Sequence, residues 1–266
     1  NHARRQITSA AQIEALNIPT LQAIHSKLYG YADDFRFLIV GNVDLDTLKP
    51  LVEKYLGSLP TSKKVEYAVV DDGVRFVDGN VVNDFRTPMQ QPKVSVRLVY
   101  SGDMENNAKN RMIVELLSRA LDSRYMISIR EEKGGTYGVS VQGGIEKYPT
   151  EEYMMAIVFD TNEQLADELV EICDKEIKKI AEEGPLADDV AKSKEFLQKN
   201  YNNVLENNGG WMSAITRWYE EGYNYKEEYL GVLESVTLDD VKAFAQKMLD
   251  DGNRTLVVMR PDNTTK

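Results

Sequence analysis

The stretch Ile129-Arg130-Glu131-Glu132-Lys133-Gly134-Gly135-Thr136-Tyr137-Gly138-Val139-Ser140 joins a helical pattern to a strand pattern. Apolar residues recur at helical spacing before it, which predicts a helix with one buried face: Ile113, Leu116, Leu117, Ala120, Leu121 and Ile127. Gly134 and Gly135 can adopt the left-handed backbone that ends such a helix. Val139 and Val141 then alternate with polar residues, which is typical of a strand. The stretch therefore predicts a helix that turns back into a strand.

Arg130 and Tyr137 stand seven residues apart across this corner. We expect both side chains to emerge at the same end of the helix–strand pair, where a guanidinium fork and a hydroxyl could hold a carbonyl or carboxylate oxygen. A purely structural interpretation is also open. An arginine in the last turn of a helix complements the helix dipole, and a tyrosine at the start of a strand often packs at the edge of a core.

The pattern on either side of the corner predicts further elements. From Lys93 onward, Val94, Val96, Leu98 and Tyr100 alternate as a half-buried strand. More strands and helices follow at residues 153–159, 163–182, 187–206, 211–218 and 226–233. This order predicts an α+β fold, in which helices pack on one face of a largely antiparallel sheet.

Aromatic residues crowd the region around the predicted helices near the C-terminus: Trp211, Trp218, Tyr219, Tyr223, Tyr225 and Tyr229. Two interpretations are open for this group, namely packing between helices and a surface that binds peptide. Packing is the favoured interpretation, because aromatic side chains at helical spacing usually contribute to a core.

The two ends of the chain resemble each other. Thr20 and Thr237 each stand where they could cap a helix, and a β-rich run follows each helix, at Phe37–Asn42 and at Thr255–Arg260. We therefore expect residues 1–60 to be the C-terminal part of a preceding similar domain. Residues 61–92 would form a linker and entry strand, and residues 93–266 a second domain. Because half a domain exposes an apolar face, residues 1–60 should dock on the second domain or on another copy.

Composition excludes several classes of function. The 266 residues carry a net charge of −11, and the pI of about 4.9 means that the chain would repel nucleic acids and anionic membranes. The sequence contains no stretch apolar enough to span a membrane. Its single cysteine, Cys173, cannot form an intramolecular disulfide or a cysteine-based zinc site, and we expect it to lie in the core. Because the chain opens at Asn1 without a methionine, we expect a piece of a longer protein.

Taken in order, several motifs resemble the C-terminal part of the M16 metallopeptidases, the pitrilysin and insulin-degrading-enzyme family, in its bacterial zinc-protease branch. The motifs are Leu38-Ile39-Val40-Gly41-Asn42-Val43-Asp44, Tyr55-Leu56-Gly57-Ser58-Leu59-Pro60, Gln91-Pro92, Leu121-Asp122-Ser123-Arg124 through Arg130, Gly135-Thr136-Tyr137, and Glu206-Asn207-Asn208-x-x-Trp211. The resemblance spans nearly the whole chain. It implies an M16-type domain that follows the end of a similar one.

Zinc is held in this family by an inverted motif, His-x-x-Glu-His, with a further glutamate downstream. The chain has only His2 and His25, and no glutamate stands at the required offset. We therefore expect neither a metal site nor catalytic residues in this chain, and His25 should be a surface or packing residue. What the resemblance does imply is substrate binding by Arg130 and Tyr137, which match a family pair that holds the peptide beside the zinc.

The expected function is that of a non-catalytic, substrate-binding half of a zinc-dependent endopeptidase. Its partners would be a zinc-bearing half, in the same protein or in another subunit, and an extended peptide substrate. The alternative is an inactive scaffold or interaction module, a role that M16-like domains also take. Bacterial members of this branch are often exported, so the resemblance favours the periplasm over the cytoplasm.

Overall fold

The fold is built around one five-stranded sheet with the strand order β1-β5-β2-β4-β3. The computed structural model describes residues 6–62, 68–131, 133–134, 136 and 138–262. Its strands are β1 (Asn80–Thr87), β2 (Val94–Asp103), β3 (Val139–Glu146), β4 (Glu152–Thr161) and β5 (Arg254–Pro261). β1 runs parallel to β5, whereas the β5–β2, β2–β4 and β4–β3 pairs are antiparallel. The predicted α+β class with a largely antiparallel sheet is confirmed.

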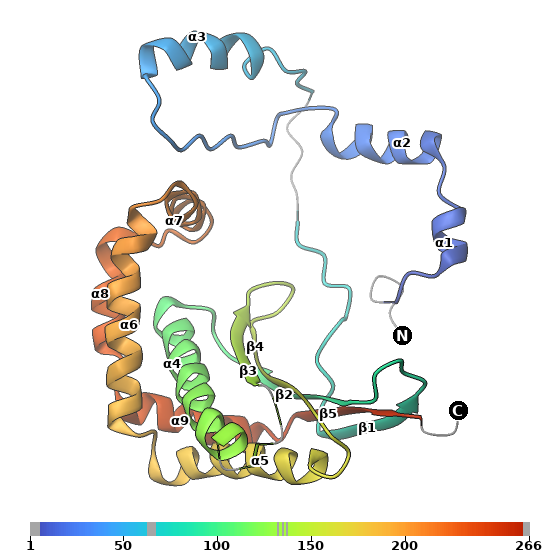
Figure 1. Ribbon diagram of the computed structural model, residues 1–266. Coiled ribbons are helices and arrows are strands. Elements are labelled where there is room, and N and C mark those ends of the chain that lie inside the picture. The colour runs from blue at the N-terminus through green and yellow to red at the C-terminus, as the bar shows by residue number, and fades with distance from the viewer. Residues whose placement is uncertain (1–5, 63–67, 132, 135, 137, 263–266) are drawn as a thin grey trace.

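Helices cover one face of this sheet (Figure 1). α4 (Ala108–Tyr125), α5 (Ala166–Glu183) and α9 (Leu238–Asp251) share a single hydrophobic core with β2 and β4. α6 (Ala187–Leu205), α7 (Asn208–Glu221) and α8 (Tyr225–Ser235) form a column beside α4, which we call the helical arm.

Buried and more exposed residues alternate along β2, which shows which face of the sheet packs against the core. Val94, Val96, Leu98 and Tyr100 of β2 are all buried, as their spacing predicts, and the residues between them face the uncovered side of the sheet. Cys173 of α5 is completely buried, which confirms its predicted place in the core. Burial raises the pKa of the Cys173 thiol, so that it stays protonated.

A π-helical turn, Met126–Glu131, continues α4 and corrects one prediction. Ile127 was expected on the buried face, but its side chain is 50% exposed, whereas Ile129 is completely buried. A π turn holds more residues than an α turn, so it rotates the positions after it around the helix axis. Spacing counted at 3.6 residues per turn therefore selects the wrong isoleucine.

The segment before residue 61 differs most from its prediction. It contains α1 (Ala10–Glu14), α2 (Ile18–Tyr29) and α3 (Leu45–Tyr55), none of which has a buried residue. Residues 36–40 form no strand, although their β-rich composition predicts one. A strand needs a neighbour to receive its backbone hydrogen bonds, and no described strand lies beside this run.

The sequence predicts that Thr20 and Thr237 both cap a helix, and this prediction is confirmed only for Thr237. Thr237 caps α9 through a capping box with Asp240. In α2, by contrast, the cap is Asn17, whose side chain accepts a hydrogen bond from the Thr20 amide at 3.0 Å, so Thr20 lies inside the helix. Asn17 precedes the proline-containing first turn, and an asparagine there caps as well as a threonine does.

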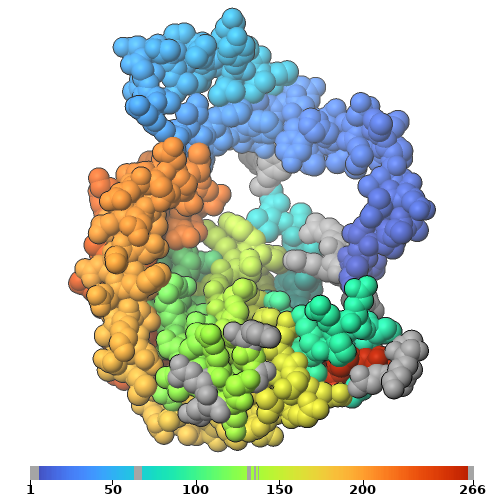
Figure 2. All heavy atoms as spheres, in the orientation of Figure 1, coloured from blue at the N-terminus to red at the C-terminus, as the bar shows by residue number. Residues whose placement is uncertain are grey.

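The N-terminal segment, residues 6–62, arches over the sheet and its helices instead of packing its apolar face against them (Figures 1 and 2). Leu21, Ile24 and Leu28 form a stripe along α2, and each remains about half exposed, at 48–50%. One contact reaches the helical arm, where the Arg36 guanidinium lies 4.2 Å from the centre of the Tyr219 ring. We expected this apolar face to dock either on the rest of the chain or on another copy. The structure does not show the first of these two outcomes.

Candidate functional site

The corner between α4 and β3 is closed by a left-handed glycine. Gly134 has φ +62°, and its amide donates a hydrogen bond to the Arg130 carbonyl at 3.1 Å, which ends the helix. Lys133 then ties the corner to the first turn of α5 through an ion pair with Glu168, at 2.5 Å. These contacts hold the backbone that follows Arg130.

Arg130 lies in the π-helical turn, and its side chain is exposed. Its guanidinium is 3.3 Å from the Met126 sulfur, and no carboxylate of the described residues forms an ion pair with it. The arginine can therefore meet a ligand without first breaking a salt bridge to a described residue. Tyr137, the other predicted site residue, lies outside the described residues.

A cavity of about 620 Å³ opens beside this corner. We call it the corner cavity, and it is lined by Pro92, Lys93, Gly134, Thr136 and the end of β4 at residues 160–162. Sheet register explains why these segments meet, because Val94 pairs with Thr161 and Val139 pairs with Phe159. The start of β2, the end of β4 and the approach to β3 consequently lie at one end of the sheet.

Several residues of the corner cavity carry polar side chains. Asp160 accepts hydrogen bonds of 2.6 Å from both the Lys93 ammonium and the Ser95 hydroxyl. Burial acts to raise the pKa of Asp160, but these two hydrogen bonds outweigh it and lower the pKa, so the carboxylate stays ionised. The Thr136 hydroxyl donates to the Gly138 carbonyl at 2.9 Å. Such groups suit the binding of a peptide backbone.

Zinc does not fit the part of the chain that the structure describes. Among these residues no group of three or more His, Cys, Asp or Glu side chains is placed to hold a metal ion. His25 lies exposed on α2, with its ring 5.3 Å from that of Tyr29, which confirms its predicted surface position. His2 lies outside the described residues.

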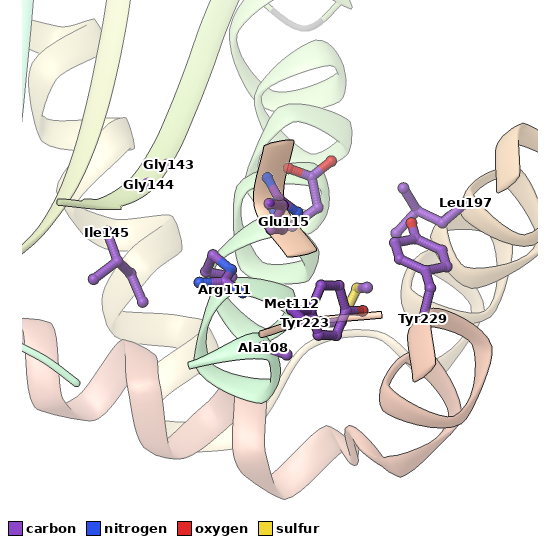
Figure 3. Close-up of a pocket in the computed structure, with 11 residues that line it drawn as sticks. Ala108, Arg111, Met112, Glu115, Gly143, Gly144, Ile145, Leu197, Tyr223 and Tyr229 are labelled. Carbon is purple, nitrogen blue, oxygen red and sulfur yellow. The ribbon is translucent and has the colours of Figure 1, made fainter. Parts of the chain in front are cut away.

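A second cavity, of about 400 Å³, is lined by residues of the helical arm, α4 and β3 (Figure 3). Arg111, Gly143, Arg217, Tyr223 and Tyr229 contribute to its lining, and we call it the arm cavity. For part of the aromatic group, the packing interpretation is confirmed, since Tyr201 stacks on Tyr225 and Tyr229. Sequence reasoning missed the cavity because its lining comes from five separate elements and the loop before α8.

Comparison with known proteins places the chain in a family. Residues 15–197 match the family described as "Peptidase M16 inactive domain". The chain belongs to this family. An Arabidopsis thaliana protein named "Zinc protease PQQL-like" is 25% identical over 198 residues, which cover 70% of this chain and 21% of that protein. The "Probable zinc protease PqqL" of Haemophilus influenzae is 18% identical over 241 residues, covering 85% of this chain and 24% of the relative.

Solved structures share the fold of this M16 chain. The crystal structure of the periplasmic protease PqqL from Escherichia coli superposes with a TM-score of 0.81 at 20% identity, covering 97% of this chain and 29% of that one. The chain therefore spans about a fifth to a quarter of the length of the curated relatives it matches. Within the described residues, every helix is too short or too polar to cross a membrane.

Proposed function

We propose that this chain is the non-catalytic, substrate-binding half of a zinc-dependent endopeptidase, and that Arg130 and Tyr137 hold an extended peptide. The observation that carries the proposal is the exposed Arg130 guanidinium, which has no carboxylate partner among the described residues, at a corner that borders a cavity of about 620 Å³. Membership of the M16 inactive-domain family supports a binding role for this half.

The chemistry assigned to each residue is electrostatic. A peptide carbonyl develops negative charge when it is attacked, and a tyrosine hydroxyl at Tyr137 would stabilise that charge by hydrogen bonding. Arg130 would anchor neighbouring backbone oxygens through its planar fork of donors. Zinc would be held by another part of the same protein or by a partner subunit, where it would supply the activated water.

The remaining parts of the proposal concern setting and substrate. Residues 1–60 would complete a preceding M16-type domain, with residues 61–92 leading into the second domain, residues 93–266. A relative of the same fold has been crystallised as a ferredoxin protease in complex with Arabidopsis ferredoxin, which supports a protein or peptide as the substrate class. Since the Escherichia coli relative is a periplasmic protease, the periplasm is the compartment we propose.

Reconstitution with the zinc-bearing region tests this function. The chain is mixed with the separately expressed, zinc-loaded upstream region, and cleavage of a quenched unstructured peptide is followed. We expect the wild-type chain to restore cleavage, and Arg130→Ala and Tyr137→Phe each to lower kcat/KM by about tenfold or more, because each removes a hydrogen bond to a charged or charge-developing oxygen.

Arg119→Ala is the matched control, because Arg119 lies on α4 but is held by Glu115 at 2.6 Å. This variant should cleave like the wild-type chain. If Arg130→Ala and Tyr137→Phe do the same, the two residues are structural. If a folded, zinc-loaded mixture shows no cleavage, the scaffold alternative replaces the proposal.

A further inference from the structure

The arm cavity lies at an edge of the sheet that is only partly covered. β3 is the last strand in the order β1-β5-β2-β4-β3, so its outer backbone groups have no neighbouring strand among the described residues. Two of its carbonyls are capped by side chains. Ser118 of α4 donates to the Val141 carbonyl at 3.2 Å, and the Asn106 amide donates to the Ile145 carbonyl at 3.0 Å.

Gly143 stands midway between these two capped positions. Alternate residues of a strand point their backbone groups to the same side, so the N–H and C=O of Gly143 also face the outer edge. No described side chain is hydrogen-bonded to them, and Gly143 lines the arm cavity. A Cβ atom here would lie 2.6 Å from Val114 Cγ1, so glycine lets β3 pack this closely on α4.

Two tyrosines face the same cavity from the arm side (Figure 3). Neither the Tyr223 nor the Tyr229 hydroxyl has a hydrogen-bond partner among the described residues. Because no buried side-chain oxygen among these residues lacks a partner, both hydroxyls are open to solvent in the cavity. Burial raises the pKa of both phenols to about 12, so at neutral pH each hydroxyl is a protonated donor. A ligand that enters the cavity can therefore accept hydrogen bonds from both hydroxyls without displacing a protein partner.

The arginines of the cavity have different roles. Arg111 bridges α4 to the end of α7 through an ion pair of 2.8 Å with Glu221, so its charge is already compensated. Arg217 is exposed on α7, lines the cavity, and has no carboxylate partner among the described residues. In a chain with a net charge of −11, this leaves one uncompensated guanidinium beside two unused hydroxyl donors and an open strand edge.

We propose that the arm cavity is a second peptide-binding site, separate from the corner cavity, which takes a short extended segment bearing a carboxylate. The segment pairs with Gly143 along the outer edge of β3. Its carboxylate accepts hydrogen bonds from Arg217 and from the Tyr223 and Tyr229 hydroxyls. The volume of about 400 Å³ suits a few residues, and it lies within the range of ordinary ligand sites. A free C-terminus and an acidic side chain both supply such a carboxylate, and the experiment below distinguishes them.

Binding to the full chain is measured by amide chemical shifts of the ¹⁵N-labelled protein. The probes are N-acetyl-Ala-Ala-Ala with a free carboxylate, the same peptide as its C-terminal amide, and N-acetyl-Ala-Glu-Ala amide. We expect the free acid or the glutamyl peptide to shift the Gly143 and Gly144 resonances. The uncharged amide should bind with an affinity at least about tenfold lower. The stronger of the two acids identifies the source of the carboxylate.

Variants then assign the binding groups. Arg217→Gln should weaken binding of the carboxylate-bearing peptide by about tenfold. The double variant Tyr223→Phe/Tyr229→Phe should weaken it by a similar factor. Arg97→Gln, which removes an exposed arginine of β2 that lines no part of the arm cavity, should bind as the wild type does. Circular dichroism checks that each variant is folded.

Three results would overturn the proposal: no binding at millimolar peptide, equal binding of acid and amide, or shifts centred on Gly134 and Thr136 of the corner cavity. The assay needs neither zinc nor cleavage, so its failure would leave the proposed endopeptidase function untouched. Conversely, failure of the reconstituted cleavage would not remove a binding site measured on this chain alone.

Discussion

At the scale of single residues, the neighbouring glycines of β3 show how position decides the effect of a side chain. A Cβ atom on Gly143 would lie 2.6 Å from Val114 Cγ1 and 3.0 Å from Met155 Cε, both in the packed core. A Cβ atom on Gly144 would meet nothing within 4 Å. The two glycines are adjacent in one strand, so they point to opposite faces of the sheet.

This contrast predicts opposite effects on stability. Gly143→Ala should lower the free energy of unfolding by about 1–3 kcal/mol, because the methyl group overpacks the contact between β3 and α4. Gly144→Ala should leave it unchanged or raise it by up to about 1 kcal/mol, since alanine restricts the unfolded chain. Urea denaturation of both variants measures the difference, and similar midpoints would contradict it.

At the scale of elements, equal sequence signals lead to different structures at the two ends of the chain. Thr237 accepts a hydrogen bond from the Asp240 amide at 3.1 Å, and the Asp240 carboxylate accepts one from the Thr237 amide at 2.8 Å. In the sequence both threonines stand before an apolar run at helical spacing, but only Thr237 precedes its helix, whereas Thr20 lies within α2. Because α9 packs into the core and α2 does not, only the cap of α9 bears on the stability of the domain.

Removing each threonine tests this difference. Thr237→Ala should destabilise the domain by about 1 kcal/mol, since two amides at the start of α9 lose their partners or their geometry. Thr20→Ala should change the free energy of unfolding by less than about 0.5 kcal/mol, because its side chain is exposed. Thermal or urea unfolding compares the two, and equal losses would argue against the assigned caps.

At the scale of the whole molecule, the chain consists of one packed domain and an N-terminal segment without a core. The sheet and its helices bury the residues of a continuous core, while α1, α2 and α3 contain no buried residue. Helices of this length are marginal in water when nothing packs on their apolar face. Under the proposed function, the zinc-bearing half is the natural candidate to cover that face.

Hydrogen exchange on the full chain tests this view. Amides of α2 and α3 should exchange within seconds to minutes, whereas those of β2 and β4 should be protected by orders of magnitude, because opening them requires unfolding of the core. Under the proposed function, adding the zinc-bearing half should slow exchange in α2 and α3 and leave β2 and β4 unchanged as internal references. Protection of α2 in the chain alone, equal to that of α4, would contradict the prediction.

The sequence by itself determined the α+β class, the buried face of β2, the core position of Cys173 and the helix–strand corner at Arg130, because these depend on local periodicity and on glycine conformation. Only the tertiary structure decided that Ile129 replaces Ile127 in the core and that residues 36–40 stay outside any sheet. It alone also brought Gly143, Arg217 and Tyr223 to one cavity. These outcomes depend on contacts between segments far apart in the chain, or on the lack of a neighbouring strand. A local sequence pattern predicts neither of these.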